Sequence, residues 1–292
     1  MNDFIKIDLH MHTTISDGTD TPGQLLEYVR EKGLQLFSVT DHDAVKGSLQ
    51  IPEYLREGDP KFLTGVEFSC KDREDTKKKY HILGYGYDPE SESMRKLVET
   101  GHRYRMEKLE MRLDHLKSEF GVVFPKEEVD SLYQMDNPGK PHIGNLMVQY
   151  GYAPSRNEAI NKMINKLHVK GQYFTPDQAI EGILGGGGIP VLAHPSYGSG
   201  DQLIIGEEMD RRLRKLMGYG LKGVEAFYSG FNRKLQDEVL GFAEKYNLYV
   251  TAGSDYHGRN KLVVLGDTNL EEGMEYPPGL VRFLEDMEPE ML

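Results

Sequence analysis

Histidines, aspartates and glutamates that could bind a metal recur at the ends of the apolar runs in this chain. The first run, Phe4 to Leu9, leads directly into His10 and His12. Because side chains two residues apart on a strand point to the same side, these two imidazoles can face one space. An isolated H-x-H pair fits a chance surface pair equally well, so the prediction depends on the later runs.

Six later apolar runs carry residues of the same kinds at or near their ends. These residues are Asp41 and His42, Glu67, His81, His194, Glu225, and Asp255 with His257. The seven runs have the composition of strands and lie near 4–10, 34–40, 61–68, 80–86, 188–194, 223–228 and 247–254. Active sites of β/α barrels are built from the carboxyl ends of their strands. The pattern therefore predicts a metal site at one rim of a barrel.

Helical patterns lie between most of these strands. Thr21-Pro22 and Thr175-Pro176 each supply an N-cap threonine and a proline suited to the first turn. Two further patterns lie near 208–217 and 233–245. Strands that alternate with helices indicate parallel β/α units, and seven such strands suit a barrel. The Gly185–Gly188 run lacks the Lys-Ser/Thr of a P-loop, so we expect a helix end and a tight turn there.

One segment is too long for a single β/α unit, because His194 follows His81 by 113 residues. We therefore expect an inserted helical domain at residues 99–172, between barrel segments 1–98 and 173–292. Its helical patterns lie near 101–120, 141–150 and 155–167, the last opened by a capping box at Ser155 to Glu158.

The composition is that of a globular chain, with 38% hydrophobic residues, 28% charged residues and a net charge of −12. So acidic a chain is not expected to follow a long nucleic acid by means of a basic surface. No apolar run approaches the ~20 residues that span a bilayer, and the start of the chain, with Asp3, predicts no signal peptide. The single cysteine, Cys70, fits a reducing compartment. We therefore expect a cytoplasmic protein without a membrane partner.

These motifs together resemble those of the polymerase and histidinol phosphatase (PHP) family. The matching segments are His10-Met11-His12, Ser16-Asp17-Gly18 with Pro22, Thr40-Asp41-His42, Gly65-Val66-Glu67, His81, Ala193-His194-Pro195 and Gly253-Ser254-Asp255-Tyr256-His257. They occur in the family's order and cover nearly all of the chain outside the insertion. Within the family, the insertion resembles that of bacterial nucleotide phosphatases and short-RNA 5′-exonucleases through Arg103, Arg105 and Lys140-Pro141-His142.

The resemblance implies an α/β fold, a distorted (β/α)7 TIM-like barrel with a small inserted helical domain, and a site for three metal ions. The first ion would take His10, His12, Glu67 and Asp255; the second Glu67, His81 and His194; the third Asp17, His42 and His257. Because six of these nine ligands are imidazoles, the ions are expected to be Zn, Mn or Fe rather than Ca or Mg. The positive charge of three divalent ions exceeds the negative charge of the three carboxylates among these ligands. The remaining positive charge would balance a phosphate dianion and one hydroxide.

The implied activity is a trinuclear metal-dependent phosphoesterase. It would hydrolyse nucleoside mono- or 3′,5′-bisphosphates, or short oligonucleotides, with a water whose pKa the metals lower to about 7. The expected catalytic residues are Asp17, His42, Glu67, Asp255 and His257. The expected substrate-binding residues are Arg103, Arg105, Lys140 and His142, on an insertion that would act as a lid.

Three alternatives stay open at this point. Histidinol phosphate is a rival substrate, and metal-loaded barrels also include amide and ester hydrolases. A PHP domain without catalysis is a third possibility, which the complete ligand set disfavours. The residues next to the ligands also have two interpretations: Asp8 and Asp41 could orient histidines or make ordinary hydrogen bonds, and Glu225 could be a ligand or could support one.

Overall fold

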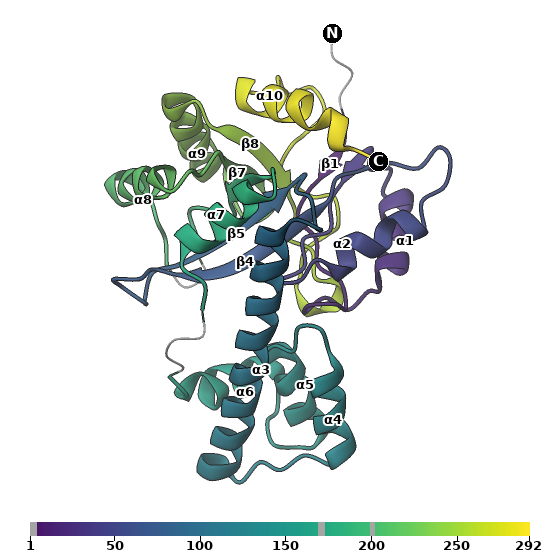
Figure 1. Cartoon of the computed structure of the whole chain (residues 1–292), viewed down its shortest axis with the longest axis vertical. Coiled ribbons are helices and arrows are strands. Elements are labelled where there is room, and N and C mark those ends of the chain that lie inside the picture. Colours follow the sequence, from purple (N-terminus) through teal and green to yellow (C-terminus); the bar gives the residue numbers. More distant parts are fainter. Residues whose placement is uncertain (1–4, 169–172, 199–201) are drawn as a thin grey trace.

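The computed structural model describes residues 5–168, 173–198 and 202–292 (Figure 1). Asp3, Phe4 and the end of the predicted insertion at 169–172 lie outside the described residues. The strands are β1 (Ile7–Asp8), β2 (Leu36–Phe37), β3 (Lys61–Phe62), β4 (Gly65–Lys71), β5 (Lys79–Tyr85), β6 (Ile189–Leu192), β7 (Gly223–Tyr228) and β8 (Tyr249–Gly253). They coincide with the predicted runs, except that the run at 61–68 is divided into β3 and β4.

Two sheets contain these strands. β1, β2 and β3 form a short parallel sheet, and β4 to β8 form a second sheet in sequence order. Isolated bridges join the sheets at Met11 with Tyr256 and at His42 with Glu67. In the described part of the chain the hydrogen bonding thus gives two bridged sheets of an α/β fold, and a closed barrel is not seen.

The prediction that all units are parallel is wrong for two strand pairs. β4 pairs antiparallel with β5, and β5 pairs antiparallel with β6. Only residues 72–78 separate β4 from β5, which is too short for the crossover that a parallel pair requires. β6, β7 and β8 are parallel, as predicted, and their connections contain α8 (Gly206–Gly218) and α9 (Arg233–Tyr246).

Local capping signals explain where the other predicted helices begin and end. α1 (Pro22–Glu31) begins after Thr21, which forms a capping box with Gln24. α7 (Pro176–Gly185) ends in the predicted glycine run, where Gly187 adopts a φ of 78°. The sequence did not predict α2 (Lys46–Gln50), α4 (Lys126–Gln134), α10 (Pro278–Met287) or the 3₁₀ turns η1 (Ile51–Glu53), η2 (Ile164–Lys166), η3 (Gly258–Asn260) and η4 (Glu288–Glu290).

The long helix α3 (Glu92–Phe120) connects the sheets to a group of helices at one end of the molecule (Figure 1). Its first turns, with Met94 and Leu97, pack into the main core. Its later turns, with Leu109 and Leu116, join a separate apolar cluster with α4, α5 (Lys140–Gln149) and α6 (Arg156–Lys162).

The predicted domain boundary at residues 98 and 99 falls inside α3 and stays a prediction. None of the helices in the described ranges has the length and apolar character needed to cross a bilayer.

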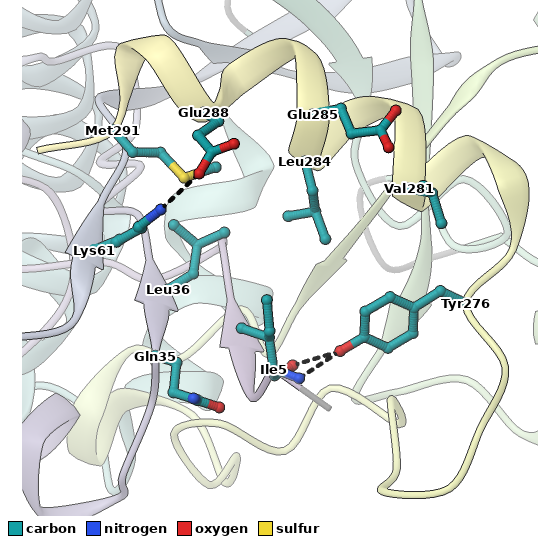
Figure 2. Close-up of a pocket in the computed structure, with 10 residues that line it drawn as sticks. All are labelled: Ile5, Gln35, Leu36, Lys61, Tyr276, Val281, Leu284, Glu285, Glu288 and Met291. Carbon is teal, nitrogen blue, oxygen red and sulfur yellow. Dashed lines mark hydrogen bonds and ion pairs between the residues drawn. The ribbon is translucent and has the colours of Figure 1, made fainter. Parts of the chain in front are cut away.

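α10 lies over the amino ends of β1 to β3 and encloses an apolar cavity of about 510 Å³ (Figure 2). Of its lining residues, Ile5 and Gln35 lie just before β1 and β2, and Lys61 is the first residue of β3. The Tyr276 hydroxyl accepts from Ile5 N at 2.6 Å and donates to Ile5 O at 3.0 Å. This cavity therefore lies at the strand ends opposite to those that carry the predicted metal ligands.

The contact between α3 and α7 yields a test of the fold. A Cβ on Gly182 of α7 would lie 2.2 Å from Leu97 Cδ1, whereas a Cβ on Gly241 of α9 would have no atom within 4 Å. We expect Gly182→Ala to lower the free energy of unfolding by about 1–3 kcal/mol through overpacking. The matched Gly241→Ala should raise it by about 0.5–1 kcal/mol. Urea denaturation measures both, and equal stabilisation by the two changes would contradict the close approach of the helices.

Candidate metal centre

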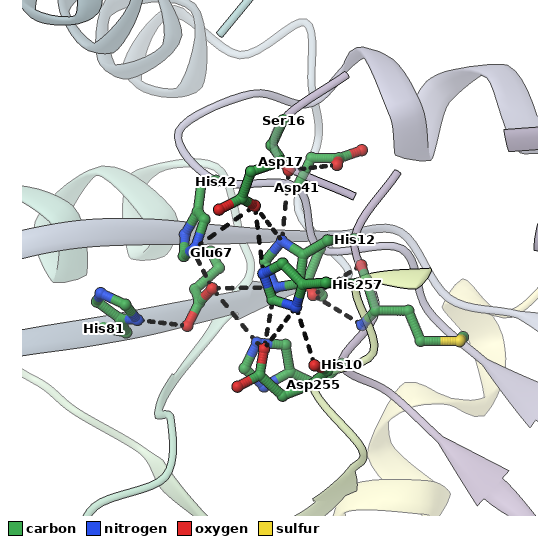
Figure 3. Close-up of polar contacts among 12 residues, drawn as sticks. His10, His12, Ser16, Asp17, Asp41, His42, Glu67, His81, Asp255 and His257 are labelled. Carbon is green, nitrogen blue, oxygen red and sulfur yellow. Dashed lines mark hydrogen bonds and ion pairs between the residues drawn. The ribbon is translucent and has the colours of Figure 1, made fainter. Parts of the chain in front are cut away.

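The nine side chains predicted as metal ligands lie together at one end of the strands. Figure 3 labels all of them except His194. In chain order they are His10 and His12 after β1, Asp17 in the following loop, His42 after β2, Glu67 in β4, His81 in β5, His194 after β6, and Asp255 with His257 after β8. Both sheets therefore contribute to a single cluster, which is possible only because the bridges hold the sheet edges together.

Glu67 occupies the middle of this cluster and is completely buried. Its Oε2 lies 2.9–3.3 Å from nitrogens of His10, His12 and His42. Its Oε1 lies 2.9 Å from His81 Nδ1 and 3.4 Å from His194 Nε2. The two oxygens thus face two separate groups of imidazoles, which is the arrangement needed for a carboxylate that bridges two cations.

The other two carboxylates extend the cluster on the same side. Asp255 Oδ1 lies 3.6 Å from His10 Nε2 and 3.5 Å from His12 Nε2. Asp17 Oδ1 lies 3.2 Å from His257 Nε2 and 4.0 Å from His42 Nε2. The geometry therefore brings each aspartate to the histidines with which it was predicted to share an ion.

Unpaired buried atoms test whether these residues fit metal ions. Among the described residues, the buried atoms without a hydrogen-bond partner include His10 Nε2, His12 Nε2, Asp17 Oδ1, His42 Nδ1, and Glu67 Oε1 and Oε2. Leaving a buried polar atom unsatisfied costs about 1–3 kcal/mol, so native structures rarely do so. Imidazole nitrogens and carboxylate oxygens are also the donors that Zn, Mn and Fe accept. The residues fit bound divalent cations.

The donor atoms fall into three close groups. Within each group all the donor atoms lie within 4.8 Å of one another: His12, Asp17, His42 and His257; His10, His12 and Glu67; and His42, Glu67 and His81. His12 and His42 each belong to two groups, whereas the prediction assigned each of these histidines to one ion.

Charge effects within the cluster favour the ligand forms of Glu67 and His81, whereas they favour the protonated form of His42. Burial opposes ionisation of Glu67, but the imidazoles of His42 and His10 outweigh it and hold the pKa of Glu67 well below its usual range. Against burial, Glu67 in turn raises the pKa of His42 to about 9. Burial lowers the pKa of His81 to about 4. At neutral pH the carboxylate is therefore ionised and His81 is neutral, as metal ligation requires.

Three buried carboxylates lie beside the predicted ligands and differ in what they bind. Glu225 accepts from His10 Nδ1 at 2.9 Å and from His194 N at 2.8 Å, so it orients one ligand and fixes the backbone of another. Asp8 accepts from Ser254 N at 2.9 Å and Gly266 N at 2.8 Å and contacts no imidazole directly. Asp41 makes ordinary hydrogen bonds to Thr13 and Ser16. Of the open interpretations, support of a ligand is the one that fits Glu225.

Sequence reasoning missed two side chains that hold Asp255. The Tyr228 hydroxyl donates to Asp255 Oδ2 at 3.0 Å, and the Lys261 ammonium contacts the same oxygen. These bonds occupy the outer oxygen of Asp255 and leave Oδ1 directed at the histidines. Tyr228 is the last residue of β7, so its place at the carboxyl end of a predicted strand was the available signal.

Two cavities open beside the cluster, and both are lined by Asp17, His42 and His81. The first, called here the tyrosine cavity, has a volume of about 360 Å³ and includes Tyr197 and Tyr228 in its lining. The second, called here the basic chamber, has a volume of about 830 Å³. Its basic lining residues are Lys71, Lys77, Lys79, Arg105, Lys108, Arg112 and Lys140.

The predicted substrate-binding residues occupy different places. Arg105 and Lys140 line the basic chamber. His142 lies close by, and its Nδ1 accepts from Gly139 N at 2.9 Å, which leaves Nε2 as the protonated nitrogen of the neutral ring. Arg103 is exposed, stacks on Tyr104, and lines neither the tyrosine cavity nor the basic chamber.

The inserted region contacts the segments that carry predicted metal ligands through more than one side chain. Asn137, between α4 and α5, donates to the backbone carbonyl of His42. The Arg156 guanidinium contacts the side chain and the backbone carbonyl of Asn260. Asn260 in turn donates to the backbone carbonyl of Asp17 at 2.7 Å. The insertion is thereby tied to the loop that carries a predicted ligand.

Comparison with known proteins agrees with this site. The family model described as PHP domain matches residues 8–174. The chain is 27% identical over 268 residues to the phosphoribosyl 1,2-cyclic phosphate 1,2-diphosphodiesterase of Eggerthella lenta, covering 86% of this chain and 94% of that protein. It is 26% identical over 260 residues to the 3′,5′-nucleoside bisphosphate phosphatase of Chromobacterium violaceum, covering 86% and 87%.

Among solved structures, the chain resembles a proposed metal-dependent phosphoesterase from Bifidobacterium adolescentis. The TM-score is 0.76 at 26% identity, and the similarity covers 95% of both chains. The family match extends over more than half of the sequence, from Asp8, before the first two histidines, to Phe174, shortly before α7. This chain belongs to the PHP domain family.

Proposed function

We propose that this protein is a metal-dependent phosphoesterase that hydrolyses phosphate esters of nucleotides or short oligonucleotides. One observation carries the proposal: a cluster of orphaned buried metal ligands opens directly into a chamber lined by cations. Metal ligands alone fit many hydrolases, whereas cations beside them favour an anionic substrate over a neutral amide. The named relatives, a cyclic phosphate diphosphodiesterase and a bisphosphate phosphatase, support the same class of substrate.

The proposed centre holds three ions, each assigned to one of the predicted ligand sets. The two carboxylate oxygens of Glu67 face two different groups of imidazoles, which supports two ion sites that share Glu67 as a ligand. The contact between Asp17 and His257 supports a third ion site. The imidazole-rich donor set favours Zn, Mn or Fe. Such ions would lower the pKa of a water to about 7 and neutralise charge on a phosphoryl group.

The residues of the chain would prepare the site for this chemistry. Glu225, Tyr228 and Lys261 fix the orientation of His10 and Asp255, so that little reorganisation is needed when the reaction begins. Arg105 would contact the phosphate from the chamber side, since it lines the same cavity as Asp17 and His42. His142 could donate a proton to the substrate from Nε2, because Nδ1 is already occupied by Gly139 N.

The size and charge of the molecule favour a small substrate. The two cavities have volumes of about 360 and 830 Å³, which suit a nucleotide or a short oligonucleotide. Outside them the net charge of −12 gives little attraction for an extended nucleic acid. We therefore propose that a long polymer is not the substrate.

Removing a central carboxylate tests the catalytic assignment. We expect Glu67→Gln and Asp255→Asn each to reduce kcat/KM for nucleoside phosphates by about a thousandfold or more, or about 4 kcal/mol, with circular dichroism unchanged. Phosphate release from nucleoside mono- and bisphosphates, a dinucleotide, histidinol phosphate and an amide panel measures the effect and the specificity. Glu244→Gln, on the exposed side of α9, is the matched control. Activity within tenfold of wild type in either variant would exclude the assigned role.

Metal removal tests the three-ion centre independently of activity. A ligand that binds only the folded state at a hundred times its Kd stabilises by about 2.7 kcal/mol. Chelation should therefore lower the Tm by about 5–10 °C, and Zn or Mn should restore it. The same addition should raise the Tm of Glu67→Gln by less than that of wild type, since both shared sites lose their bridge and the third set, Asp17, His42 and His257, remains. Elemental analysis should find more than two equivalents per chain, and one equivalent at full activity would refute the three-ion centre.

A further inference from the structure

The basic chamber concentrates positive charge in a protein that is otherwise acidic. Among the described residues, seven lysine or arginine side chains line it, and Asp17 is the one carboxylate in the lining. Because Asp17 is itself a predicted metal ligand, its charge would be neutralised by a bound ion. Arg105 is paired with Asp43, and the excess of basic over acidic residues in the lining would then leave the chamber positively charged next to the metal centre.

Two of these cations are buried, which distinguishes them from ordinary surface lysines. Lys108 and Arg112 lie one turn apart on α3, so they project from the same face of the helix. They are only 4% and 5% exposed, and neither forms an ion pair with a carboxylate of the described residues. Arg112 Nη1 also lacks a hydrogen-bond partner there. Burying an unpaired charge is costly, so these positions are unfavourable for the fold.

Among the described residues, Lys108 has further cations near it, and the carboxylate near it is already paired with Arg105. Its ammonium lies 4.4 Å from the centre of the Tyr173 ring, and the Lys71 ammonium lies 3.5 Å from the same ring. The carboxylate of Asp43, which is nearby, is engaged by Arg105. Burial and Arg105 hold the pKa of Lys108 well below its usual range. A bound anion would relieve this repulsion and satisfy the unpaired guanidinium nitrogen.

We propose that Lys108 and Arg112 form a second phosphate site, which binds a phosphate group of the substrate other than the one attacked at the metal centre. The inference rests on the proposed phosphoesterase function and specifies its substrate class, namely esters with at least two phosphates. Arg112 is suited to bidentate phosphate contacts, and Lys108 supplies a point charge. The second phosphate could be the other monoester of a nucleoside bisphosphate or the adjacent phosphodiester of a short oligonucleotide.

The kinetic test compares substrates with one and two phosphates. Lys108→Met and Arg112→Met should each lower kcat/KM for adenosine 3′,5′-bisphosphate by at least tenfold, and for 3′-AMP and 5′-AMP by less than threefold. Lys117→Met, an exposed charge removal near the end of the same helix, should change neither. Equal losses on mono- and bisphosphates, or no loss on either, would overturn the second site.

A 5′-phosphorylated dinucleotide distinguishes the two sources of the second phosphate. Loss on the bisphosphate alone identifies a terminal monoester as the occupant. Loss on both substrates shows that the site also accepts a phosphodiester, and both of these results support the proposal. Loss on the dinucleotide without loss on the bisphosphate would overturn it.

Binding to the chelator-treated protein separates this inference from the proposed function. Calorimetry with adenosine 3′,5′-bisphosphate should give a Kd at least tenfold weaker for Arg112→Met than for wild type and Lys117→Met, with a smaller salt dependence. If no substrate is hydrolysed but this binding difference remains, the phosphoesterase function fails and the anion site stands. If binding is unchanged, the anion site fails whatever the activity.

Thermal stability supplies the structural control. If these cations serve substrate binding at the expense of the fold, Lys108→Met and Arg112→Met should have a Tm equal to or above that of wild type. A Tm several degrees lower in both variants would show that the cations hold the fold together, and would overturn the proposal.

Discussion

The fold around the metal centre depends on one buried carboxylate. Glu67 has both oxygens inside the protein without hydrogen-bond partners among the described residues, and imidazoles from four separate segments converge on it. Attraction between this charge and its neighbours holds the carboxyl ends of both sheets together. Glu225 binds His10 Nδ1 and Tyr228 binds Asp255 Oδ2, so that His10 Nε2 and Asp255 Oδ1 are the atoms that remain available to bind an ion. The same carboxylate that organises the strand ends therefore also directs its two oxygens to two separate groups of imidazoles.

The parts of the molecule that follow from local chemistry could be predicted from the sequence. Strand runs and N-cap threonines lie where they were expected, because alternation and capping are properties of a few neighbouring residues. Most of the predicted ligands could be located because they lie in a strand or shortly after one. Asp17, in the loop after His12, was assigned through the family resemblance. His81 lies near the amino end of β5, which reaches the same edge because β5 is antiparallel to its neighbours. The antiparallel pairing of β4 with β5 could have been predicted from a different signal. The segment between the two strands is short, and its length is visible in the sequence.

Positions that depend on packing could not be predicted in this way. Arg103 and Arg105 look alike in sequence, but two residues on a helix differ in direction by about 200°, and the structure leaves the first on the surface and the second in the chamber. Asp255 adopts a φ of 60°, which is uncommon for a non-glycine residue and is stabilised by contacts from Tyr228 and Lys261. Neither conformation is determined by its neighbours in the chain.

Helix α3 connects the main core, the basic chamber and the inserted helices, and the direction in which each of its side chains points depends on its position along the helix. Leu97 anchors it in the main core, Arg105 and Arg112 reach the chamber, and Leu116 belongs to the core of the inserted helices. Each residue added to a helix rotates everything beyond it by about 100°. A single insertion between Leu97 and Arg105 would turn the chamber cations and the whole helical group away from the metal centre together. The length of α3 between Leu97 and Leu116 therefore determines, at the same time, the direction of the chamber cations and the position of the inserted helices.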